Sequence, residues 1–93
     1  PFMNYSASKA FMGTEGITES SLTNDEKLVI QTERAMIEHA QEVIILADDS
    51  KFGKIGHLTL CPVEKAAKII TTREADPRLV SVLRDKGIEV IQV

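Results

Sequence analysis

The chain has 93 residues, room for one small domain, and a formal net charge of −3 at pH 7. Surfaces that bind nucleic acid carry clustered Lys and Arg, and no such cluster occurs, which argues against direct nucleic-acid binding by this chain. The single cysteine excludes an internal disulfide, and the longest apolar run, Val43–Ala47, is too short to cross a bilayer. We therefore expect a cytoplasmic protein without a membrane partner.

A short strand is predicted at Lys9–Met12, followed by a turn at Gly13–Gly16. Two glycines three residues apart permit positive φ angles that other residues resist. The backbone N–H groups of this turn, the Thr14 hydroxyl and the Glu15 carboxylate could hold sugar hydroxyls or an oxyanion. The alternative is a turn without a ligand, because two glycines alone are a weak signal.

A helix with a capping-box signal is predicted next, with Thr23 as its cap and Glu26 three residues later. Ile30 and Ile37 fall on its charged face, where they mark either a contact between subunits or ordinary exposed aliphatic residues. The opposite face carries the stripe expected to pack against a sheet, which consists of Leu28, Val29, Thr32, Ala35, Met36, His39 and Ala40.

The strongest strand signal is Glu42–Ala47, which is β-branched and almost uniformly apolar, as in a central strand of a parallel sheet. The polar loop Asp48–Gly53 follows it directly. In this loop Lys51 could supply a positive charge for a phosphate or carbonyl oxygen, and Asp48 could accept a hydrogen bond from a hydroxyl. The alternative is a solvated loop in which Asp and Lys only pair at the surface.

The remaining elements complete an alternating pattern of strands and helices. Short strands are predicted at 57–60, 68–71 and 88–93, and a helix begins at Asp76-Pro77 and ends at Gly87. The pattern predicts an α/β fold with three layers, a mostly parallel, Rossmann-like sheet with helices on both faces. Ligands of such sheets bind beyond the carboxyl ends of the strands, where the two polar loops are expected to meet.

Other residues that could carry chemistry have simpler explanations. His39 and His57 lack a Cys or His partner set, so packing in the core or at its edge is expected. Cys61 has no assignable acid–base partner and is expected to be an inert thiol. The sequence contains no zinc spacing, P-loop, dinucleotide fingerprint or nucleophile elbow, and we expect neither metal, cofactor nor catalytic residue.

Two strings resemble the sensor domain of DeoR-type bacterial repressors. AFMGTEGI at residues 10–17 is similar to that family's AF-hydrophobic-GADGI segment, with Thr14-Glu15 where Ala-Asp is usual. VIILADDSKFG at residues 43–53 is the more specific match, a hydrophobic strand followed by Asp and Ser-Lys-Phe-Gly. Ile69–Thr72 and Gly87–Val90 continue the resemblance in order, so that it covers nearly the whole chain.

The resemblance implies a homo-oligomeric regulator whose sensor, related to the ribose-5-phosphate isomerase fold, binds a phosphorylated sugar. It also implies that residues 1–93 are part of the sensor domain, with its first part and a winged helix-turn-helix upstream of Pro1. DNA would then be a partner only through that missing N-terminal domain. The ligand-binding residues implied are Gly13, Thr14, Glu15, Gly16, Asp48, Ser50 and Lys51.

Two other functions remain open at this point. A sugar-phosphate isomerase would need a general base over the carbon-bound proton, and Glu15 is the one candidate expected near Lys51. A ligand-free dimerisation domain would need no site. Because no second acid–base partner can be assigned, we expect that the chain is not an enzyme.

Overall fold

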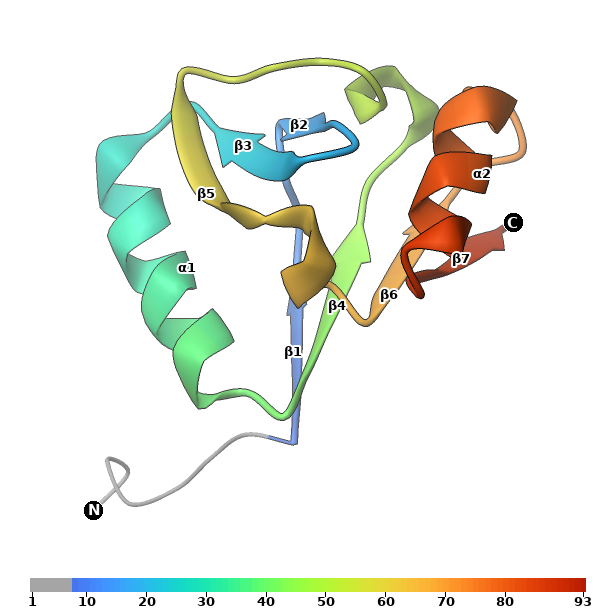
Figure 1. Ribbon diagram of the computed structural model, residues 1–93. Coiled ribbons are helices and arrows are strands. Elements are labelled where there is room, and N and C mark those ends of the chain that lie inside the picture. The colour runs from blue at the N-terminus through green and yellow to red at the C-terminus, as the bar shows by residue number, and fades with distance from the viewer. Residues whose placement is uncertain (1–7) are drawn as a thin grey trace.

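The computed structural model describes residues 8–93, which form two sheets and two helices (Figure 1). The parallel sheet has the strand order β1-β4-β6-β7 and consists of β1 (Lys9–Met12), β4 (Glu42–Leu46), β6 (Lys68–Thr71) and β7 (Glu89–Gln92). The antiparallel sheet consists of β2 (Gly16–Ile17), β3 (Ser21–Asn24) and β5 (Leu58–Pro62). The helices are α1 (Lys27–His39) and α2 (Pro77–Asp85), with short 3₁₀ turns at η2 (Asp49–Lys51) and η3 (Val63–Lys65).

The parallel sheet confirms the predicted α/β class. Strand β4 lies between β1 and β6, and its residues Val43–Ile45 are buried, as expected for a central strand. Helix α2 also begins as predicted, because the Asp76 side chain accepts a hydrogen bond from Arg78 N and Pro77 occupies the first turn. Gly87 has a φ of 91°, which suits a residue without a side chain just after the helix.

The antiparallel sheet is not predicted by the sequence, and it corrects the expected start of α1. Thr23 does not cap the helix, because it lies in β3, where it is buried and pairs with Thr59 of β5. Helix α1 begins only at Lys27, after Glu26, whose side chain makes no capping hydrogen bond. Leu22 next to Thr23 is fully buried, and this hydrophobic burial favours the strand over a local cap.

The face of α1 that packs inward is also the opposite of the predicted one. Ile30 is 3% exposed and Ile37 packs against the core, whereas Leu28 in the predicted buried stripe is 79% exposed. Arg34 lies on the same face as these two isoleucines, and its guanidinium donates hydrogen bonds to the Thr59 and Leu60 carbonyls at the edge of β5. Because Ile30 is buried in the core and Ile37 packs against it, the face expected to be exposed points inward, and Ile30 is not available for a subunit contact.

The two histidines are also not packed as predicted. His39, at the end of α1, is exposed. The His57 side chain is 83% exposed, and its Nδ1 lies 3.1 Å from Asp25 Oδ1. Cys61, in contrast, is buried as the inert-thiol interpretation requires, and burial raises the pKa of its thiol to about 11.

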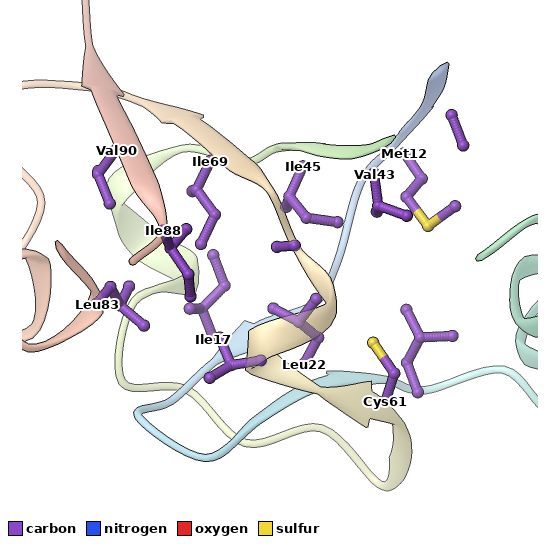
Figure 2. Packing of buried hydrophobic residues seen from close by; sticks show 14 of the residues in the cluster. Met12, Ile17, Leu22, Val43, Ile45, Cys61, Ile69, Leu83, Ile88 and Val90 are labelled. Carbon is purple, nitrogen blue, oxygen red and sulfur yellow. The ribbon is translucent and has the colours of Figure 1, made fainter. Parts of the chain in front are cut away.

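The core lies between the two sheets. Figure 2 shows side chains from one face of the parallel sheet, such as Met12, Ile45 and Ile69, pointing toward Ile17 and Leu22 of the antiparallel sheet. Helix α1 joins this core through Ile30, and α2 joins it through Val80 and Leu83. None of the helices in residues 8–93 is long and apolar enough to span a membrane.

The opposite face of the parallel sheet is partly open to solvent. Successive side chains of a strand point to alternate faces, so Phe11 of β1 and Leu46 of β4 point away from the core. Phe11 is 56% exposed and Leu46 is 46% exposed. Residues 8–93 therefore leave large apolar side chains on this face uncovered.

Candidate functional site

A cleft of about 390 Å³ lies where β1 and β4 end. The turn at Gly13–Glu15 follows β1, and the segment Asp48–Lys51 follows β4, which pairs with β1 in parallel. Lys51 Nζ lies 3.5 Å from Glu15 Oε1, so the two polar loops meet as predicted. The cleft is lined by Gly13, Thr14, Glu15, Asn24, Val29, Glu33, Leu46, Ala47, Asp48 and Lys51.

The Thr14 hydroxyl is occupied within the protein. Thr14 is buried, and its Oγ1 lies 2.7 Å from the Thr23 carbonyl and 3.0 Å from the Gly16 carbonyl. A hydroxyl has one proton to donate, so this proton is used to hold the turn against β3. Thr14 can still offer a lone pair to the cleft, but its first role is to fix the turn.

Gly16 is the first residue of β2, directly after the turn, and does not line the cleft. A Cβ atom at this position would meet the Lys54 carbonyl oxygen at 2.1 Å and Thr23 Oγ1 at 2.5 Å. Glycine is therefore required for close approach of the chain. The sequence predicts a positive φ in this turn, and the structure corrects this, because among residues 8–93 the glycines with positive φ are Gly53 and Gly87.

Asp48 shapes the loop that presents Lys51. Its carboxylate caps η2 by accepting hydrogen bonds from the hydroxyl and from the backbone N–H of Ser50, the latter at 2.9 Å. The hydroxyl bond and the backbone bond together lower the pKa of Asp48, so this residue carries its negative charge at neutral pH. The Ser50 hydroxyl donates to Asp48 and orders the loop, and Ser50 is not among the residues that line the cleft.

The loop is also tied to its neighbours in the fold. The Thr72 hydroxyl donates to Asp49 Oδ1 at 2.8 Å, which links η2 to the end of β6. Gly53 N donates to the Ile17 carbonyl at 2.7 Å, which links the loop to β2. The side chain of Lys51 is 24% exposed. These contacts order the loop that places Lys51 at the cleft, where its side chain is partly exposed.

Two polar residues of the cleft, Asn24 and Glu33, are not predicted by the sequence, and neither are its apolar lining residues Val29, Leu46 and Ala47. Asn24 Oδ1 accepts from Glu15 N at 2.8 Å, and Asn24 Nδ2 donates to Glu33 Oε1. Burial raises the pKa of Glu33, and the hydrogen bond from Asn24 opposes this shift. No local signal identifies either residue, because Asn24 resembles part of a helix start and Glu33 resembles a solvated helical charge.

The cleft is rich in hydrogen-bond acceptors. Glu15, Glu33 and Asp48 provide three carboxylates among its lining residues, and Lys51 is the cation in that lining. Val29, Leu46 and Ala47 add apolar surface. Carboxylates accept from hydroxyl groups and apolar side chains contact C–H groups, so this combination suits a polyol such as a sugar. Among residues 8–93 there is no group of three His, Cys, Asp or Glu side chains that could hold a metal ion.

Comparison with known proteins gives a consistent result. Residues 2–73 match the family described as the DeoR C terminal sensor domain. The chain is 40% identical over 73 residues to the HTH-type transcriptional regulator IolR of Bacillus subtilis (strain 168), an alignment that covers 77% of this chain and 29% of IolR. It is 24% identical over 89 residues to the HTH-type transcriptional regulator UlaR of Salmonella newport (strain SL254), covering 96% of this chain and 36% of UlaR. The chain thus spans about a third of the length of these curated relatives.

Proposed function

Because this chain belongs to the DeoR C terminal sensor domain family, we propose that its cleft binds a phosphorylated sugar as the effector of a bacterial transcriptional regulator. The observation that carries this proposal is the meeting of Glu15, Asp48 and Lys51 at the carboxyl ends of β1 and β4. The net charge of −3 is unsuited to DNA. We therefore assign DNA binding to a helix-turn-helix domain outside these 93 residues, as the names of the relatives suggest.

The charges in the cleft favour one orientation of the effector. A phosphate placed among Glu15, Glu33 and Asp48 would face like charges, and Lys51 is already paired with Glu15. Sugar hydroxyls, in contrast, donate well to carboxylates. We propose that the hydroxyl-bearing end lies in this cleft, with Lys51 near a carbonyl or hydroxyl oxygen. The phosphate would then be held by parts of the domain outside this chain.

The test is a thermal-shift screen of the full-length protein with pentose and hexose phosphates. A sugar phosphate that binds only the native state should add about 2.7 kcal/mol of stability at about 100 times its Kd. Lys51→Ala should remove most of this gain. Lys54→Ala is the matched control, because Lys54 lies three residues further along and does not line the cleft, so the gain should persist.

Other outcomes of this screen would contradict the proposal. An equal response to inorganic phosphate and to a sugar phosphate would mean that the sugar is not recognised. A lack of response to every compound would favour the ligand-free dimerisation domain. Binding of operator DNA by the 93-residue chain alone, with a steep salt dependence, would contradict the assignment of DNA binding to another domain.

An isomerase is the alternative, and one observation favours it. Glu33 is a half-buried carboxyl group with a raised pKa in the same cleft as Glu15, and acid–base catalysis uses such groups. Its carboxylate already accepts a hydrogen bond from Asn24, which supports a positional role instead. An isomerase assay on the full-length protein separates these functions. Turnover that is abolished by Glu15→Gln would establish an enzyme.

A further inference from the structure

Asn24 and Glu33 form a hydrogen-bonded link between the turn that carries Glu15 and helix α1. We propose that this link positions Glu15 opposite Lys51 and couples the cleft to α1, so that a conformational change in the cleft alters α1 and a change in α1 alters the cleft. Asn24 and Glu33 are positioning residues in this view. The inference rests on the proposed function for its biological meaning, but its test needs no effector.

The direction of each hydrogen bond follows from the chemistry of the groups. Glu15 N–H can only donate, so the Asn24 atom that lies 2.8 Å from it must be the amide oxygen and not the amide nitrogen. The amide nitrogen of Asn24 then faces Glu33, and the carboxyl oxygen Oε1 accepts its hydrogen bond. Each partner therefore determines the orientation of the Asn24 side chain. Because Asn24 is 6% exposed, water cannot readily replace a lost partner.

The turn depends on Asn24 but is not held by it alone. Glu15 N also donates to the Thr23 carbonyl at 3.0 Å, and the Thr14 hydroxyl bonds to the same carbonyl. These contacts join the turn to the end of β3. Among residues 8–93, the Asn24 side chain is the one that continues this connection to a side chain of α1 by a hydrogen bond. Loss of the link should therefore loosen the turn without unfolding it.

Helix α1 is placed to respond to the cleft. Val29 and Glu33 of α1 both line it, so the helix forms part of its wall. At the other side of the cleft, Glu15 is paired with Lys51, and a ligand oxygen that takes Lys51 would release the Glu15 carboxylate. The Glu15 carboxylate therefore has two arrangements, one paired with Lys51 and one released. The link through Asn24 and Glu33 would couple these two arrangements to the conformation of α1. Transmission must operate in both directions, because coupling between sites is reciprocal.

An exchange of donor and acceptor tests the link in the full-length protein without effector. Asn24→Asp keeps an oxygen for Glu15 N–H but places a carboxylate against Glu33. We expect hydrogen exchange at the Glu15 amide to accelerate by at least about threefold, with faster exchange also in α1. Glu33→Gln alone should change it little, because its Oε1 can still accept from Asn24. The double variant Asn24→Asp/Glu33→Gln should restore slow exchange, because Gln can donate to Asp.

The control is Glu64→Gln, which removes the charge of a surface pair with Lys86 and leaves the cleft intact. It should not alter exchange at Glu15. If Asn24→Asp does not fold, Glu33→Leu serves instead and should accelerate exchange at Glu15 where Glu33→Gln does not. Unchanged exchange in Asn24→Asp, or equally fast exchange in the double variant, would overturn the proposal. Either result would leave the effector screen unaffected, so failure here is distinguishable from failure of the proposed function.

Discussion

Gly13 lies in the turn after β1 and Gly16 begins β2, and their different surroundings give a prediction at the scale of single residues. The methyl group of Gly16→Ala would collide with backbone and side-chain oxygens, and we expect a loss of about 1–3 kcal/mol in the free energy of unfolding. Gly13→Ala meets its nearest atom, the Leu46 carbonyl oxygen, at 3.6 Å and should cost less than about 0.5 kcal/mol. Urea unfolding of both variants checks this, and equal losses would contradict the geometry.

Glu33 gives a second prediction at this scale, in the dependence of stability on pH. Its folded-state pKa is raised above the ordinary value of 4.5, so the folded protein holds this proton to higher pH than the unfolded chain. The contribution of Glu33 to stability therefore falls as pH rises from about 4.5 through the folded-state pKa. Glu33→Gln cannot ionise. Its Tm relative to the wild type should rise between about pH 4 and pH 7, and a constant difference would contradict the shift.

Helix α1 illustrates how a single element can have two candidate packing faces. Ile30→Ala should cost about 2–5 kcal/mol, because Ile30 is buried in the core between the sheets. Leu28→Ala should change the free energy of unfolding by less than about 0.5 kcal/mol, because Leu28 is almost fully exposed in residues 8–93. Equilibrium unfolding distinguishes the two faces. A larger loss of stability for Leu28→Ala than for Ile30→Ala would instead support the orientation that the helical wheel predicts.

For the whole molecule, the open face of the parallel sheet is the main feature. Parallel sheets normally have both faces covered, yet Phe11 and Leu46 are exposed, and the chain spans about a third of its curated relatives. We propose that more polypeptide of the full-length protein covers this face, which would supply the helices expected on both faces. Hydroxyl-radical footprinting should then label Phe11 and Leu46 less in the full-length protein than in the 93-residue chain. Leu83, buried in the core, is the control and should be weakly labelled in both.

Similar labelling of Phe11 and Leu46 in the two proteins would mean that this face remains open. A symmetrical contact between two copies of the 93-residue chain would produce a different pattern, in which protection of Phe11 increases with protein concentration. The footprinting experiment at two concentrations therefore separates cover by the same polypeptide from self-association.

Features that depend on a few neighbouring residues could be predicted from the sequence. Helix α2 is bounded by Asp76-Pro77 and Gly87, and β4 with its following loop is identified by an unbroken apolar run and then polar residues. The same local order places Glu15 and Lys51 just after two predicted strands, and the parallel pairing of β1 with β4 then brings them together in one cleft. The ends of α2 and the position of β4 are determined locally, because capping and strand burial act within a few residues, whereas the pairing of β1 with β4 is a tertiary contact.

Only the tertiary structure decided the face of α1 and the complete lining of the cleft. Aliphatic residues occur around much of α1, and the face that packs inward carries Ile30, which is buried in the core, and Arg34, which donates to the Thr59 and Leu60 carbonyls 25 and 26 positions away. Once that face is set, Glu33 is turned toward Asn24, and Asn24 toward Glu15. A helical pattern records spacing along the chain, whereas these contacts satisfy polar groups on distant strands, which is why periodicity alone chose the wrong face.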